Sequence, residues 1–112
     1  MPPPNTIQAA VFVNSNNDAV IFPPVIITAK NETVDILNTT GDDIFVIYPA
    51  DVFEGSGSAI DPNKTVVPVP DKAKHSRKVH GNTKHGRVPF KIFSAKTNAA
   101  VKANSDPEFI IE

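Results

Sequence analysis

The stretch Val88-Pro89-Phe90-Lys91-Ile92-Phe93-Ser94, VPFKIFS, places apolar side chains at alternate positions and ends on a small hydroxyl. Alternation with a period of two is typical of a β-strand that buries one face. A second apolar segment, PEFIIE, closes the chain at residues 107–112. The end of the sequence therefore predicts two strands, and the polar segment between them, AKTNAAVKANSD, is expected to be a loop or a turn of helix.

The same period recurs through the first half of the chain. It runs along TIQAAVFV at residues 6–13 and returns in AVIFPPVIIT, TVDILN and IFVIYP, with the turn-rich segments NSNNDA, AKNE and TTGDD between them. Pro23 and Pro24 lack backbone donors, so they place their strand at a sheet edge or at a bulge. The two prolines of KTVVPVP place that strand at an edge for the same reason.

These patterns predict an all-β protein with about seven to eight short strands, arranged as an antiparallel Greek-key β-sandwich. Residues 71–87, DKAKHSRKVHGNTKHGR, carry almost no apolar content and are expected to form a solvated excursion between strands. The 112 residues fit one domain, 1–112. No apolar run approaches the roughly 20 residues that span a bilayer.

The compartment stays open on sequence grounds. The N-terminus lacks the basic and apolar regions of a secretion signal. The protein is expected to be periplasmic or secreted if a signal peptide has been removed from it, and cytoplasmic otherwise. Cysteine is absent, so there is no disulfide from which to infer a redox compartment.

Two long segments carry a family resemblance. FPPVIITAKNETVDILNTTGDDIFVIYP is similar to the strand, turn and strand that precede the first copper-ligand loop of cupredoxins, the plastocyanin and azurin family. GRVPFKIFSAKTNAAVKANSDPEFIIE resembles the closing hairpin of bacterial cupredoxin-like domains. Together they cover residues 20–112 and imply a cupredoxin-like sandwich.

The copper ligands that the family implies are missing. Blue-copper sites use one Cys thiolate, two His imidazoles and a weak axial Met. By resemblance the Cys falls at Ser94, the first His near Asp43 or Ile44, and the second His and the Met within residues 95–101, AKTNAAV. Since none of these positions holds the required residue, we expect no type 1 copper and no other cofactor. The small apolar residues after Ser94 are expected to pack the loop shut; they are Ala95, Ala99, Ala100 and Val101.

His75, His80 and His85 recur every five residues and form the alternative metal site. Imidazole suits copper and other transition metals. On a strand this spacing puts the middle ring on the opposite face, and only a folded-back loop brings the three together. The neighbouring cations oppose a bound divalent ion. Copper or another metal on these histidines is therefore the runner-up hypothesis.

Charge is unevenly placed along the chain. Residues 31–63 carry −7 and residues 64–102 carry +9, within a net charge of −1. Folding either keeps these halves apart as patches or interleaves them. The candidate partner-binding residues are Lys72, Lys74, Arg77, Lys78, Lys84 and Arg87. Nucleic-acid binding is not expected, because this segment has no aromatic residue on which bases stack.

The sequence contains few patterns that are typical of a catalytic site. EGSGSA lacks the spacing of a nucleophile elbow, and Asp42-Asp43 face opposite ways on a strand, where they cannot share a proton. The sequence therefore indicates a non-enzymatic cupredoxin-like binding or structural module, docking a protein partner through charged loops. An immunoglobulin-like adhesive or assembly domain is a further alternative, since strand patterns do not separate sandwich topologies.

Overall fold

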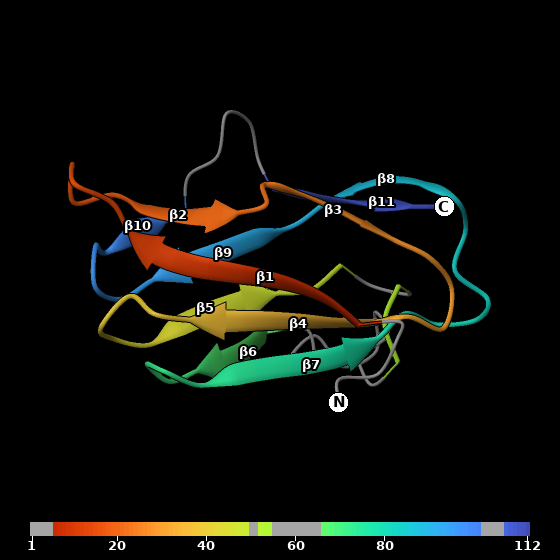
Figure 1. Cartoon of the computed structure of the whole chain (residues 1–112), viewed down its shortest axis with the longest axis horizontal. Helices are drawn as coiled ribbons and strands as arrows, with labels where there is room; N and C mark the ends of the chain where they lie inside the picture. The colour runs from red at the N-terminus through yellow and green to blue at the C-terminus, as the bar shows by residue number, and fades with distance from the viewer. Residues whose placement is uncertain (1–5, 50–51, 55–65, 102–106) are drawn as a thin grey trace.

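Short strands make up most of the computed structural model, which describes residues 6–49, 52–54, 66–101 and 107–112. Within these ranges the chain forms eleven β-strands and no helix (Figure 1). The described ranges accordingly contain no helix that is long and apolar enough to cross a membrane. The all-β class predicted from the period-two pattern is confirmed.

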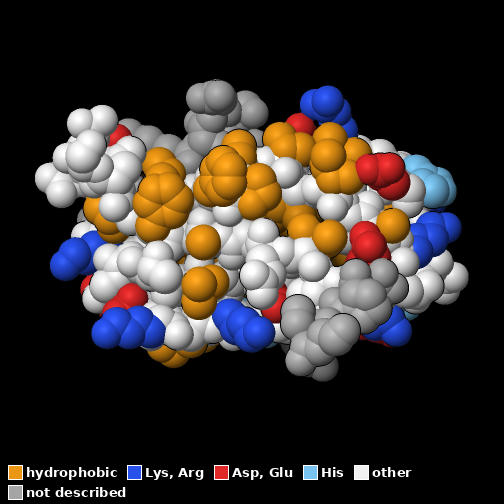
Figure 2. Space-filling model, in the orientation of Figure 1, with side chains coloured by type: hydrophobic (Ala, Val, Ile, Leu, Met, Phe, Trp, Pro, Cys, Tyr) orange, Lys and Arg blue, Asp and Glu red, His pale blue; other side chains and the backbone are white. Residues whose placement is uncertain are grey.

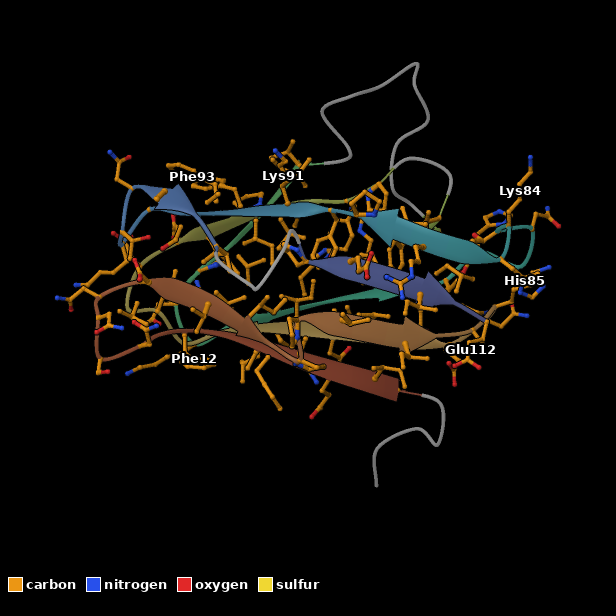
Figure 3. All side chains as sticks on the ribbon, turned by 90° about the horizontal axis from the view of Figure 1, so that it is seen from above. Phe12, Lys84, His85, Lys91, Phe93 and Glu112 are labelled. Atoms are coloured by element: carbon orange, nitrogen blue, oxygen red, sulfur yellow. The ribbon has the colours of Figure 1, made fainter. Side chains whose placement is uncertain are left out.

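The strands are β1 (Thr6–Val13), β2 (Ala19–Phe22), β3 (Val25–Thr28), β4 (Thr33–Asn38), β5 (Ile44–Ile47), β6 (Val66–Val69), β7 (Lys74–Lys78), β8 (Gly86–Pro89), β9 (Lys91–Ser94), β10 (Ala99–Ala100) and β11 (Glu108–Ile111). They pair into two four-stranded sheets, β2-β1-β4-β7 and β10-β9-β5-β6, and one three-stranded sheet, β3-β11-β8. The two four-stranded sheets form the layers of the sandwich (Figures 1 and 3).

The three-stranded sheet links the two layers along the chain. β3 follows β2 directly after Pro23-Pro24, and β8 leads into β9 through Phe90 alone. β2 and β3 are both edge strands, as is β6 with its Pro68. This is where residues without a backbone N–H are tolerated, because an edge leaves donors unpaired. The edge positions predicted for the proline-containing strands are confirmed.

One core fills the space between the layers. Along β1 the side chains of Ala9 and Val11 are buried while Gln8 and Phe12 face solvent, as the alternation predicts. Aromatic rings continue the core toward one end of the sandwich. The ring centroids of Phe90 and Phe109 are 4.1 Å apart, those of Phe109 and Phe53 4.9 Å, and those of Phe53 and Tyr48 5.3 Å.

The pairing of the strands departs from the expected antiparallel arrangement. β1 runs parallel to β4, and β3 runs parallel to β11. Two expected strands are also each divided, at Pro23-Pro24 and at Phe90, which raises the number of strands above the predicted seven to eight. Alternation shows which face of a strand is buried, but it carries no information on the direction of the neighbouring strand.

The solvated excursion predicted for residues 71–87 is wrong in part. Lys74–Lys78 form β7, an edge strand paired with β4. Its alternation is present but involves polar residues: His75 and Arg77 are half-buried, and the three residues flanking them are exposed. An apolar pattern could not reveal this strand, because polar side chains occupy its inner positions. After Ser94, residues 95–98 form a turn as expected, and the two-residue strand β10 follows it, while residues 102–106 of this segment lie outside the described residues.

Candidate functional site

Two buried residues occupy the positions that the resemblance assigns to copper ligands. Ile44 at the start of β5 lies directly opposite Ser94 at the end of β9 in an antiparallel pair. Both residues have 0% of their surface exposed. The fold therefore brings together two positions that lie far apart in the sequence, as the resemblance implies.

Asn38 braces the turn beside this pair. Its side-chain Nδ2 donates hydrogen bonds to the backbone oxygens of Asp42, at 2.7 Å, and Val69, at 2.8 Å. Its Oδ1 accepts from the backbone N of Thr40 at 2.9 Å and from the Thr40 hydroxyl at 2.8 Å. All four hydrogen-bonding positions of this buried amide are used, and they tie the β4–β5 turn to β6. Sequence patterns did not single out this role.

The segment after Ser94 is held by hydrogen bonds more than by apolar packing. The Thr97 N–H donates to Ser94 Oγ at 3.3 Å, and the Ala95 N–H donates to the backbone oxygen of Asp43 at 3.0 Å. Ala99 and Ala100 are exposed on the edge strand β10, so they do not pack the loop shut as expected. Of the four small residues proposed for that role, Val101 alone is buried.

The donors at these positions do not fit a type 1 copper ion. Ile44 has no donor atom, Ser94 has a hydroxyl in place of a soft thiolate, and Asp43 is exposed. Among the residues that the structure describes, no group of three or more His, Cys, Asp or Glu side chains is arranged to hold a metal. Copper chemistry is therefore not assigned to Asp43, Ile44 or Ser94.

The three histidines have different surroundings. His75 Nδ1 is hydrogen-bonded to the buried Tyr48 hydroxyl at 2.9 Å, and the Arg77 guanidinium lies 4.8 Å from the centre of the Tyr48 ring. Burial, and then the nearby Arg77 charge, lower the pKa of His75 below its usual value. Burial also raises the pKa of Tyr48 well above 10, which keeps the phenol protonated.

The other two histidines are found in and after the β7–β8 turn. His80 Nδ1 accepts a hydrogen bond from the Asn82 N–H at 3.0 Å. His85 is exposed at the end of the molecule (Figure 3). The fold therefore does not bring the three rings to one point within the described residues. Metal binding by these histidines stays a prediction, which a titration with Cu(II) would test.

The predicted basic set does not form one patch. Ion pairs join Lys74 to Asp35, Lys78 to Glu54 and Arg87 to Glu108, with N–O distances of 3.4, 4.0 and 3.0 Å. Each of these pairs joins a residue of the basic segment 64–102 to a carboxylate outside it, so folding interleaves the charges. The Arg77 guanidinium lies over the Tyr48 ring. Lys72 is in the turn before β7, where its backbone N–H donates to the backbone oxygen of Asn38.

A basic pocket remains at the end of the molecule that carries the β7–β8 turn. Its volume is about 390 Å³, and it is lined by Val52 and residues 82–88. Lys84, His85 and Arg87 contribute basic side chains, and its described lining includes no Asp or Glu. We call this surface the basic end. Figure 3 shows Lys84 and His85 projecting there, and Figure 2 shows a histidine and cations at the same margin.

The backbone around the basic end is anchored. Thr83 is buried, its N–H donates to the His80 oxygen at 3.1 Å, and its hydroxyl donates to the Val52 oxygen at 2.8 Å. The His80 N–H also donates to the Val52 oxygen at 2.8 Å. These bonds fix the turn on the neighbouring segment, so the basic side chains project from a defined backbone.

Comparison with known proteins gives structural matches only. No protein-family model and no curated protein sequence matches the chain. A Cu(I) form of an amicyanin mutant superposes with a TM-score of 0.52 at 9% identity, covering 99% of this chain and 86% of that one. A second amicyanin mutant, also in the Cu(I) state, has a TM-score of 0.50 at 11% identity, covering 92% of this chain and 80% of that one.

A larger enzyme contains a similar domain. The multicopper oxidase McoA from Aquifex aeolicus matches with a TM-score of 0.51 at 15% identity, and the match covers 99% of this chain but 27% of that enzyme. At such identities the similarity bears on the fold alone. With the strand order and the Ile44–Ser94 pairing, it establishes that this chain has a cupredoxin-like β-sandwich fold.

Proposed function

We propose that the chain is a non-enzymatic, cupredoxin-like binding module without type 1 copper, and that it docks an acidic surface of a partner protein through the basic end. The chemistry at Ser94 and Ile44 supports the first part, because a hydroxyl and an aliphatic side chain supply neither the thiolate nor the imidazole of a blue site. Asp42 is used structurally: its Oδ1 accepts the Asp43 N–H at 2.8 Å, which is a turn-forming contact.

The basic pocket is the observation that carries the docking proposal. Lys84 and His85 form no ion pair with any other described residue, whereas Lys74, Lys78 and Arg87 each have a carboxylate partner. Lys84 therefore retains its charge for an external carboxylate, and Arg87, which is 72% exposed, has further guanidinium donors beyond its bond to Glu108. A concave basic surface of this kind steers and orients an anionic partner.

The test is a titration of the ¹⁵N-labelled chain with an amidated hexaglutamate peptide, followed by amide shifts. We expect shifts concentrated at residues 82–88 and none with hexalysine. Lys84→Glu should weaken binding about five- to tenfold, since reversing an exposed charge changes the interaction by roughly 1 kcal/mol or slightly more. Lys91→Glu is the matched control, because it makes the same charge change on β9, away from the basic end (Figure 3).

Either of two results contradicts the proposal. If both variants weaken hexaglutamate binding equally, the peptide senses only net charge. If the shifts map to another surface, the basic end is not the binding site.

A further inference from the structure

A row of four residues crosses the outer face of the β2-β1-β4-β7 sheet. Phe22 lies opposite Ala10, Ala10 opposite Leu37, and Leu37 opposite Lys74. Phe22 is 69% exposed, the largest exposed fraction of any large apolar side chain in the described residues. An aromatic ring in this position costs solubility, and clustered apolar exposure of this kind marks binding surfaces.

A pocket of about 230 Å³ lies on this face, at the row. Its lining residues are Gln8, Ala9, Ala10, Phe22, Pro23, Asp35, Leu37 and Lys74. Phe22 and Pro23 come from the edge strand and its end, while Leu37 and Lys74 come from the strands across the sheet. We call this the sheet-face pocket. Figure 2 shows apolar side chains gathered over β1 and β2.

The polar rim of the sheet-face pocket is cationic toward solvent. The Asp35 side chain is 7% exposed, and its two oxygens are already used by the Ser76 hydroxyl and by Lys74 Nζ. The Lys74 side chain is 56% exposed and has further N–H donors beyond the one directed at Asp35. The rim therefore complements an apolar group that carries a carboxylate beside it.

The size of the apolar surface favours a short segment over a second folded copy. The apolar part that lines the pocket crosses β2, β1 and β4, roughly 10 Å at about 4.8 Å per strand spacing, and Phe12, which is 37% exposed, extends the same face along β1. Stable complexes of folded proteins bury about 800 Å² on each partner, the area of a square roughly 28 Å on a side, which is wider than this apolar strip. A single bulky side chain, by contrast, fits a pocket of about 230 Å³.

We propose that the sheet-face pocket binds a peptide segment of a partner protein in which a bulky apolar residue, best an aromatic one, precedes an Asp or Glu. The apolar side chain lies between Phe22 and Leu37, and the carboxylate pairs with Lys74. This surface is separate from the basic end, so the result of the hexaglutamate titration has no bearing on it.

The test uses three acetylated, amidated tetrapeptides: Gly-Phe-Asp-Gly, Gly-Phe-Lys-Gly and Gly-Ala-Asp-Gly. In amide-shift titrations we expect Gly-Phe-Asp-Gly to shift Ala10, Leu37 and Lys74. It should bind about tenfold more tightly than Gly-Ala-Asp-Gly, as loss of a buried phenyl ring predicts. It should bind about three- to fivefold more tightly than Gly-Phe-Lys-Gly, as one exposed charge pair predicts.

Variants separate the apolar and the charged contributions. Phe22→Ser should weaken Gly-Phe-Asp-Gly about fivefold or more, whereas Phe93→Ser, at an exposed ring on the opposite layer (Figure 3), should not. Lys74→Glu should reverse the preference toward Gly-Phe-Lys-Gly. Lys74→Gln, which adds no charge near Asp35, should abolish the preference and serves if the Glu variant fails to fold.

Three outcomes overturn the proposal. The first is equal binding of all three peptides, and the second is equal weakening by Phe22→Ser and Phe93→Ser. The third is concentration-dependent shifts at Ala10 and Leu37 without peptide, matched by dimers in sedimentation velocity, which would assign the face to a second copy of this chain.

Discussion

The two ends of this sandwich are built on opposite principles. At the Ser94 end, polar atoms are buried and paired with one another: Asn38 uses every donor and acceptor, and Ser94 accepts the Thr97 N–H. At the basic end, the backbone is anchored by Thr83, while Lys84 and His85 project into solvent. One end therefore contributes to stability and the other leaves its side chains available for binding.

The copper-ligand positions of this fold lack their ligands, so the difference between the two ends indicates which residues are structural and which are available for binding. Buried hydrogen bonds are expensive to lose, so they indicate structural residues. Exposed cations on an anchored turn contribute little to folding, so substituting them tests the proposed docking without a large loss of stability. Substitutions at Asn38, His75 and Ser94 test this contrast, in order of decreasing effect.

Asn38→Ala should lower the free energy of unfolding by about 3 kcal/mol, because it removes four hydrogen bonds of a buried amide and leaves the backbone oxygens of Asp42 and Val69 without that donor. Asn82→Ala makes the same chemical change at the basic end, where the side chain is exposed, and should change stability by less than about 0.5 kcal/mol. Urea denaturation of both variants measures the difference. Equal losses would show that the two ends do not differ in this way.

A smaller effect on stability is expected at His75, a half-buried residue of the edge strand β7. Because the folded pKa of His75 is lowered, the unfolded chain takes up a proton first as the pH falls. Stability should therefore be retained above the ordinary His value of 6.5 and decline as the pH falls through the lowered pKa.

Urea denaturation between pH 7.5 and pH 5 measures this decline. His75→Gln should flatten this pH dependence, and His85→Gln, at an exposed ring, should leave it unchanged. A pH dependence that persists in His75→Gln would contradict its assignment to His75, whose ring is hydrogen-bonded to Tyr48.

Ser94→Cys should have the smallest effect, which is measured as a change in visible absorption. Mixed with Cu(II), the variant should show no strong absorption near roughly 600 nm, the thiolate-to-copper region, because neither Ile44 nor residues 95–101 supply imidazole or thioether. The visible spectrum measures this directly, with the unsubstituted chain as the control. A strong band in the variant would mean that a thiolate alone restores the site, and it would contradict the conclusion that the neighbouring residues cannot complete a type 1 copper site.

Much of the fold could be predicted from local patterns. VPFKIFS and PEFIIE bury alternate side chains, and β9 and β11 form there. TVDILN forms β4 as predicted, but Val34, Asp35 and Ile36 are buried in succession. β7 could not be predicted in this way, since its inward residues are His75 and Arg77. The role of Asn38 was equally hidden, because its partners Asp42 and Val69 are brought to it by the fold.

From the sequence, only the types of residue in the candidate sites could be predicted, and not their arrangement. The sequence supplied the basic residues, yet their ion pairs with Asp35, Glu54 and Glu108 depend on strand pairing. The sheet-face pocket was not predicted at all, because it needs Phe22, Ala10 and Leu37 side by side on three strands.

By itself, then, the sequence determined the strand faces, the absence of a thiolate, and the resemblance in its closing hairpin. Only in the folded chain do β1 and β4, and β3 and β11, pair in parallel, the charges interleave, and the residues of the basic end and of the sheet-face pocket come together. The physical reason is that a period of two records burial, which is a property of each residue with respect to water. Neighbours across a sheet are set by the packing of the whole core, which no single segment encodes.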